Sequence, residues 1–166
     1  MVRFINGRGT LAAMTPLNAG IVGAGVGLLA TAVMTLFEGV FWRRRGMEMV
    51  AEWRVNAVLS NAIRKRKHDP NQPDLKAAIG MHFVHGLLFG FAAAIIAELL
   101  GLAGPLVFAW AIGSSLVVWA IVPYATRGFF EEREGAKFSR ASLEVSLLAH
   151  LIYGTLLGIG LALLAV

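Results

Sequence analysis

Three histidines in apolar sequence are the residues of this chain best suited to chemistry. His82 and His85 lie in the stretch His-Phe-Val-His-Gly-Leu-Leu-Phe-Gly of residues 82–90, and His150 begins a similar stretch, His-Leu-Ile-Tyr-Gly-Thr-Leu-Leu-Gly, at residues 150–158. Imidazole titrates near neutral pH, ligates metal ions and haem iron, and relays protons. Ionisable residues are costly to bury in a membrane, which makes these histidines candidates for a functional site.

Three functions for these histidines stay open beside a purely structural role. His82 and His150 are candidate axial ligands of a b-type haem, for which the neighbouring glycines leave room. His82, His85 and His150, with a carboxylate, are candidate ligands of a divalent metal, although His-x-x-His alone is a weak signal. The same cluster is a candidate proton relay, or a site for a quinone headgroup or a transported ion. In the structural alternative, each histidine only hydrogen-bonds to a neighbouring helix.

Three glutamates lie within or beside the apolar segments. We expect Glu98 to reach the membrane interface, Glu38 to pair with the arginines at 43–45, and Glu144 to pair with Arg140. The chain has no cysteine, which excludes disulfides, thiolate ligands and cysteine nucleophiles. It also has no hydrolase nucleophile elbow and no P-loop. The sequence therefore does not identify an enzyme, and no cofactor is required by it.

Four apolar blocks carry these residues. The chain of 166 residues is 57% hydrophobic with a mean hydropathy of +0.69. About 20 apolar residues cross a hydrocarbon core of about 30 Å, so each block is long enough to span a bilayer. The sequence predicts an all-α membrane protein, one membrane domain over residues 1–166, with Thr15, Asp74 and Ser139 as helix N-caps. The predicted spans cover about residues 16–41, 75–100, 105–126 and 142–166.

The basic residues indicate how these spans are oriented. The chain has fifteen lysines and arginines, of which nine lie between Trp42 and Lys76, four between Arg127 and Arg140, and two before the first span. Basic connections stay on the cytoplasmic side of a membrane. We therefore expect a multi-pass cell-membrane protein with both connections in the cytoplasm and both termini outside. The net charge of +5 then reflects orientation and not nucleic-acid binding.

The longer basic connection contains a predicted amphipathic helix. Apolar residues recur mostly at steps of three and four, while Arg54, Asn61 and Lys65 occupy another face. We expect this helix to lie in the headgroup layer, with Trp53 as an interfacial anchor. The run that follows it is a predicted lipid-surface site that meets water and anionic lipid. That run consists of Arg64, Lys65, Arg66 and Lys67.

The two histidine stretches suggest an internal duplication. Each half of the chain becomes a helical hairpin, the first over about residues 16–100 and the second over about 105–166. A histidine and two glycines follow one another at four-residue steps in each half, which places them on one helix face. Glycines at this spacing let helices approach closely. The predicted packing glycines are Gly86, Gly90, Gly154 and Gly158, and we expect spans two and four to meet through them.

The glycine-rich first span followed by Met34-Thr35, together with His-x-x-Tyr-Gly-x-x-x-Gly at residues 150–158, resembles small uncharacterised prokaryotic four-helix integral membrane proteins. The resemblance implies a fold and a membrane location, and it transfers no activity and no site residue. From the residues, we expect a non-catalytic accessory or scaffold subunit that packs against other membrane-protein subunits or a second copy. The alternative is a cofactor-, proton- or ion-handling protein centred on His82 and His150.

Overall fold

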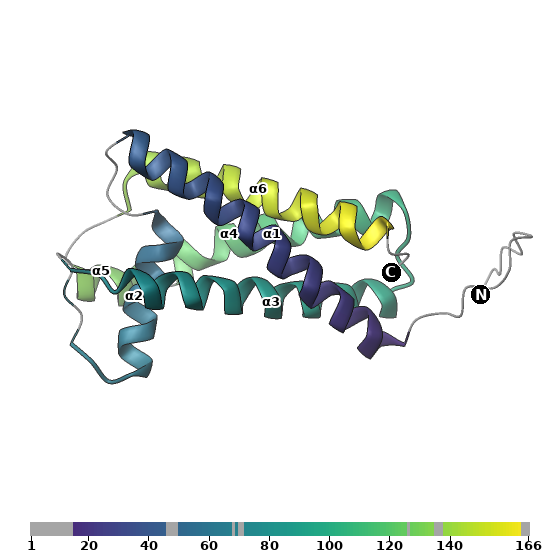
Figure 1. The fold of residues 1–166 in the computed structure, drawn as a ribbon, viewed down its shortest axis with the longest axis horizontal. Coiled ribbons are helices and arrows are strands. Elements are labelled where there is room, and N and C mark those ends of the chain that lie inside the picture. The colour runs from purple at the N-terminus through teal and green to yellow at the C-terminus, as the bar shows by residue number, and fades with distance from the viewer. Residues whose placement is uncertain are drawn as a thin grey trace, which may run out of the picture.

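The computed structural model describes residues 15–45, 50–67, 69, 72–125, 127–134 and 138–163, and in this part of the chain it contains helices and no strand. The helices are α1 (Pro16–Arg45), α2 (Ala51–Ile63), α3 (Leu75–Leu99), α4 (Pro105–Ala125), α5 (Arg127–Glu134) and α6 (Arg140–Leu163). Figure 1 shows α1, α3, α4 and α6 along the long axis of the molecule, with α2 and α5 at one end. The predicted all-α fold is confirmed.

Helices α1, α3 and α6 are each long and apolar enough to cross a membrane. The apolar part of α4 is shorter and covers Pro105–Ile121. Large apolar side chains stay exposed along the outside of these helices, as Leu29 and Leu36 of α1 do at 71% each. Exposed apolar surface of this extent marks a contact with lipid or protein. The composition of the helices thus agrees with a membrane protein.

The three predicted N-caps start their helices. The Thr15 hydroxyl accepts a hydrogen bond from the Asn18 N–H (3.3 Å), and the Asp74 carboxylate accepts one from the Ala77 N–H (2.9 Å). At α6, the Ser139 hydroxyl accepts one from the backbone N–H three residues later (3.1 Å). Each cap satisfies an N–H that has no partner within the first turn of a helix. The predicted starts of α1, α3 and α6 are therefore correct to within two residues.

A short turn at Gly101–Gly104 joins α3 to α4, and it depends on glycine. Gly101 and Gly104 have φ angles of +62° and +53°, a region that side chains with a Cβ rarely adopt. The turn makes α3 and α4 antiparallel, as predicted. Beyond the turn the two helices have few contacts, because α3 packs mainly on α1 and α4 packs mainly on α6. The bundle is closed between the two halves by the contact of α1 with α6.

The glycines of α3 lie where α1 approaches most closely. A Cβ at Gly90 would overlap the Gly23 carbonyl and would lie 2.9 Å from the Gly27 Cα. A Cβ at Gly86 would overlap the hydroxyl of Thr31. Only glycine permits this distance between the two backbones, which is the usual role of small residues between membrane helices.

The glycines of α6 have the same relation to α4. A Cβ at Gly154 would lie 2.8 Å from the Ile112 Cα, and one at Gly158 would lie 3.1 Å from the Phe108 Cα. The prediction that α3 and α6 meet through their glycines is therefore wrong. Each stripe instead faces small residues or backbone on the other long helix of its own half. Tyr153 links α6 to α3, since its hydroxyl donates to the Gly86 carbonyl oxygen (2.8 Å) and its ring centre lies 5.7 Å from that of Phe89.

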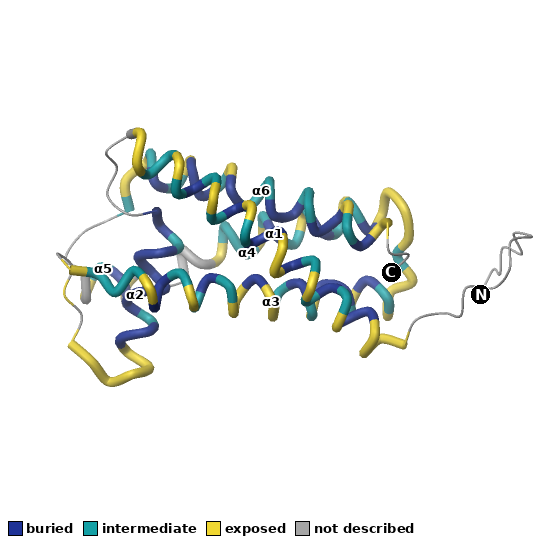
Figure 2. The backbone as a smooth tube through the Cα atoms, viewed as in Figure 1, coloured by how far each residue is buried: buried dark blue, intermediate teal, exposed yellow. Residues whose placement is uncertain are grey.

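Helix α2 exists as predicted, but it is not exposed to headgroups. It lies across one end of the bundle, against α3, α5 and α6 (Figure 1), and Figure 2 shows most of its length as buried. Trp53 is 3% exposed, so it does not anchor the chain at an interface. Arg54, expected on the polar face, is buried and lies 5.2 Å from the centre of the Phe130 ring of α5. The helix thus covers the end of the bundle as part of the fold.

Candidate functional site

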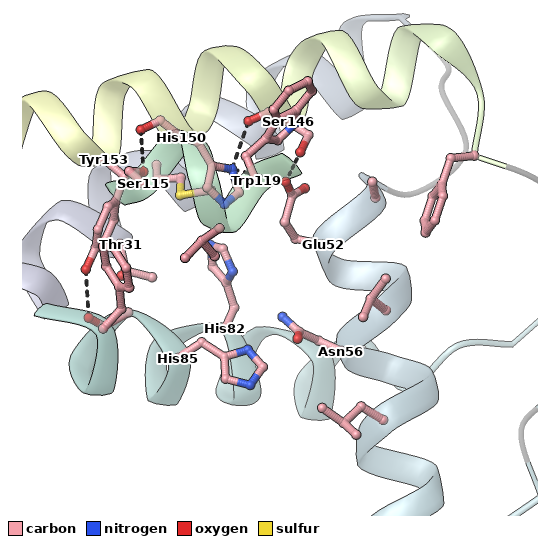
Figure 3. Close-up of a pocket in the computed structure, with 18 residues that line it drawn as sticks. Thr31, Glu52, Asn56, His82, His85, Ser115, Trp119, Ser146, His150 and Tyr153 are labelled. Carbon is pink, nitrogen blue, oxygen red and sulfur yellow. Dashed lines mark hydrogen bonds and ion pairs between the residues drawn. The ribbon is translucent and has the colours of Figure 1, made fainter. Parts of the chain in front are cut away.

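A cavity of about 410 Å³ lies between α1, α2, α3, α4 and α6, next to the end that α2 covers (Figure 3). Much of its wall is apolar, and this part includes Met34, Val55, Leu59, Phe89 and Val118. The polar part brings together two of the predicted site residues, His82 and His150, which point into the cavity from α3 and α6 (Figure 3). A mostly apolar cavity with a few converging polar groups is the usual form of a small-molecule site.

His82 forms the first of two histidine–glutamate pairs. Its Nε2 lies 3.6 Å from the carboxylate of Glu38, a residue of α1 that is fully buried. The same carboxylate oxygen accepts a hydrogen bond from the indole N–H of Trp53 (2.9 Å). Glu38 was expected to pair with the arginines at 43–45, but its side chain faces the interior, one turn after Met34, and contacts Trp53 and His82 there. The return of the chain through α2 brings Trp53 to it.

His150 forms the second pair, with Glu52 of α2. Its Nδ1 lies 3.0 Å from the Ser146 carbonyl oxygen and 3.3 Å from Glu52 Oε1. Since a carbonyl oxygen only accepts hydrogen bonds, Nδ1 carries a proton, and the other ring nitrogen is turned toward the cavity (Figure 3). The Ser146 hydroxyl also donates to Glu52 Oε1. The backbone of His150 is held against α4 as well, because the Ser115 hydroxyl donates to the His150 carbonyl oxygen (2.8 Å).

Three residues that line the cavity each have a buried polar atom without a hydrogen-bond partner. The atoms are Oε2 of Glu52, Nε2 of His82 and Nε1 of Trp119. A buried polar atom without a partner costs about 1–3 kcal/mol, so native structures rarely keep one. In a cavity of this size, the missing partner is a ligand or an ordered water. Satisfying all three atoms takes at least one donor, for Oε2 of Glu52, and one acceptor, for Nε1 of Trp119, and a bound molecule and an ordered water can share these roles.

His85 is near the site but contributes less to it. Its side chain is exposed, although it reaches the cavity edge. Among the described residues, no three histidine, aspartate or glutamate side chains lie close enough to hold one metal ion. The structure therefore does not assemble the predicted metal site of His82, His85 and His150.

The haem prediction for His82 and His150 stays a prediction, because the structure shows only what lies beside each imidazole. An axial ligand presents an imidazole nitrogen to the iron. Here a carboxylate lies beside each imidazole, at 3.6 Å from His82 and 3.3 Å from His150. The site therefore combines two acids with two bases.

The other predicted residues lie away from the cavity. The lipid-surface run from Arg64 to Lys67 is exposed after α2, and Arg64 contacts Asp74 at 3.3 Å. Glu144 pairs with Arg140 on the surface of α6, at 2.8 Å, as predicted. Glu98 lies in the last turn of α3, away from the site.

Sequence reasoning missed several members of the site. Glu52, Trp119, Ser146 and Tyr153 were not among the predicted site residues, although all four line the cavity. One signal was present for the last two, because Ser146 and Tyr153 lie one turn either side of His150 on α6. No comparable signal points to Glu52, whose partner is far along the chain.

Comparison of the chain with protein-family models, curated proteins and solved structures gave no match.

Proposed function

We propose that this chain is a four-span membrane protein that binds a small amphipathic molecule in the cavity, where the two histidine–glutamate pairs recognise its polar end. The observation that carries this proposal is the set of three unpartnered buried polar atoms on residues that line the cavity, Glu52, His82 and Trp119. Such atoms are conspicuous in a membrane interior, where few other partners exist. The buried acids and bases also make the site suited to exchanging protons with what it binds.

The membrane topology is part of the proposal. We propose that α4 spans the bilayer beside α1, α3 and α6, with the basic connections in the cytoplasm and both termini outside. In support, α1 ends and α3 and α6 begin at the end of the bundle where α2 and α5 lie (Figure 1). The chain has no cysteine, so single cysteines report location directly. A cysteine at Lys67 should resist impermeant thiol reagents in intact cells and one at Ala103 should react, and the reverse labelling would refute the orientation.

An accessory or scaffold subunit is the second candidate, and one of its supports has weakened. That expectation depended in part on glycine faces that were available to partner chains. In the structure, the glycines at 23, 27, 86, 90, 154 and 158 face other helices of the same chain. Other glycines have open space beside them. Gly25 and Gly113 are examples, since an added Cβ would meet nothing within 4 Å, and they lie on different helices, α1 and α4. Fewer glycines are therefore left on the outside of the protein for contact with a partner chain than the sequence suggested.

Filling the cavity tests the binding function. Val118 lines the cavity from α4, whereas its neighbour Val117 is 55% exposed on the outside of the same helix. We expect Val118→Trp to abolish saturable binding and Val117→Trp to leave it intact. Leu59→Trp fills the cavity from α2. If both cavity-filling variants lose binding, a folding defect confined to α4 does not explain the loss.

The measurement is calorimetric titration of the protein in lipid nanodiscs with three small probes. Benzylammonium, benzyl alcohol and phenylacetate share a benzyl group and differ in charge. The proposal requires saturable binding of at least one probe by the wild type and by Val117→Trp, with loss in both cavity-filling variants. If no probe binds saturably, or if binding is unchanged in both filled variants, the binding function is refuted and the accessory role is favoured.

A further inference from the structure

The geometry of the cavity points to a class of ligand: we propose that it binds an organic cation, an ammonium group on an apolar body, with the charged end against Glu52. This inference rests on the proposed binding function and goes beyond it. It follows from three features of the cavity: the charges on its wall, the unpartnered oxygen of the Glu52 carboxylate, and the aromatic residues in its lining.

The fixed charges favour a cation. No lysine or arginine lies among the described residues that line the cavity. Two carboxylates serve this region, Glu52 on the wall and Glu38 behind His82. The basic groups are three imidazoles, which are neutral in one of their two states. An anion in the cavity would therefore lie near one or two carboxylates, with no permanent positive charge to offset their repulsion. A cation would be attracted by the same carboxylates.

Glu52 has one oxygen with hydrogen-bond partners and one oxygen without. Oε1 accepts from the Ser146 hydroxyl and lies 3.3 Å from His150 Nδ1. Oε2 is buried and has no hydrogen-bond partner. A carboxylate oxygen only accepts, so the group that satisfies Oε2 must be a donor. An ammonium N–H supplies the donor and the counter-charge together, which makes a charge-assisted hydrogen bond.

Aromatic rings supply the second half of the recognition. Phe89, Trp119, Phe138 and Tyr153 line the cavity from α3, α4, the segment before α6, and α6 itself. The face of an aromatic ring attracts a cation, and tryptophan does so most strongly. The remaining wall is aliphatic, from residues such as Met34 and Leu59, and suits an apolar body. A cavity that is lined by a carboxylate, aromatic rings and aliphatic side chains is thus matched to an alkyl- or arylammonium ion.

The test compares three probes on the protein in nanodiscs: benzylammonium, benzyl alcohol and phenylacetate. We expect benzylammonium to bind at least about tenfold more tightly than the other two, because only it makes a charge-assisted bond to the carboxylate. Glu52→Gln keeps the size of the side chain and removes its charge, and should abolish this preference. Glu144→Gln is the matched control, since Glu144 lies on the surface of α6 in an exposed ion pair, and should leave the preference unchanged.

A second variant keeps the test sound if Glu52→Gln does not fold. Trp119→Leu removes one ring from the wall, and should weaken benzylammonium more than benzyl alcohol. If phenylacetate or benzyl alcohol binds as tightly as benzylammonium, and binding still requires an open cavity, the cation inference is refuted while the binding function stands. If no probe binds, both fail. A preference for benzylammonium that survives Glu52→Gln also refutes the assignment to Glu52.

Discussion

Substitution of Gly86 by alanine tests the close approach of α1 and α3. The added Cβ would overlap the Thr31 hydroxyl and lie 2.9 Å from the Thr31 Cβ, so one helix must move or Thr31 must change its rotamer. Overpacking of this kind costs about 1–3 kcal/mol in free energy of unfolding. Alanine also gains about 0.5–1 kcal/mol over glycine within a helix, which offsets part of the loss.

A matched control separates the two effects. A Cβ at Gly25 of α1 would meet nothing within 4 Å, so Gly25→Ala receives the helical gain without the overlap. The difference between the two variants should therefore equal the overpacking alone, about 1–3 kcal/mol. The assay is reversible unfolding of the purified protein by sodium dodecyl sulfate in mixed micelles, followed by circular dichroism.

The double variant identifies the atoms responsible. Thr31→Ala removes the hydroxyl and the methyl that the new Cβ would meet. In that background the penalty of Gly86→Ala should fall by about 1 kcal/mol or more, as a coupling energy between residues in contact. The reasoning is refuted if Gly86→Ala is as stable as Gly25→Ala, or if its penalty is the same with and without Thr31.

Three further substitutions test the polar contacts by the same assay. Trp53→Phe removes the N–H that reaches the buried carboxyl group of Glu38 and should cost about 0.5–3 kcal/mol, the range that spans hydrogen bonds to neutral and to charged groups; a loss below this range would contradict this contact. Tyr153→Phe removes one hydrogen bond to a carbonyl of α3 and should cost about 0.5–1.5 kcal/mol, whereas no loss would show that this hydrogen bond does not stabilise the fold. Glu144→Gln breaks only an exposed ion pair and should change stability by less than about 0.5 kcal/mol, so a larger effect would show that this pair is not solvent-exposed.

The parts of the fold that depend on neighbours in sequence could be predicted. The N-caps at Thr15, Asp74 and Ser139 act on N–H groups three residues later, so their signal is local. The apolar blocks likewise set the helices because length and composition are local properties. The pairing of the helices is not local. A glycine stripe such as that of Gly86 shows that another helix comes close, but not which helix.

The site divides in the same way. His82 and His150 stood out because they are polar residues in apolar sequence, and both reach the cavity. Their partners could not be predicted, since Glu52 meets His150 only after the chain has folded α2 back across the bundle. Glu38 was assigned to the nearest arginines by sequence distance. Its actual neighbour, Trp53, seemed to belong at a lipid interface because the amphipathic pattern of α2 is the same for burial against protein as for burial in lipid.

The division of the glycine contacts between the two halves of the chain has a consequence for biosynthesis. The interface of α1 and α3 lies wholly within the first half, so it can form while the second half is still being made. At about 5–20 residues per second, synthesis from Leu99 to Leu163 takes roughly 3–13 s. During this interval His82 already has Glu38 beside it, whereas Glu52 has yet to receive His150. The nascent protein therefore acquires its second pair, and with it the wall of the cavity that α6 supplies, only when the last helix has been made.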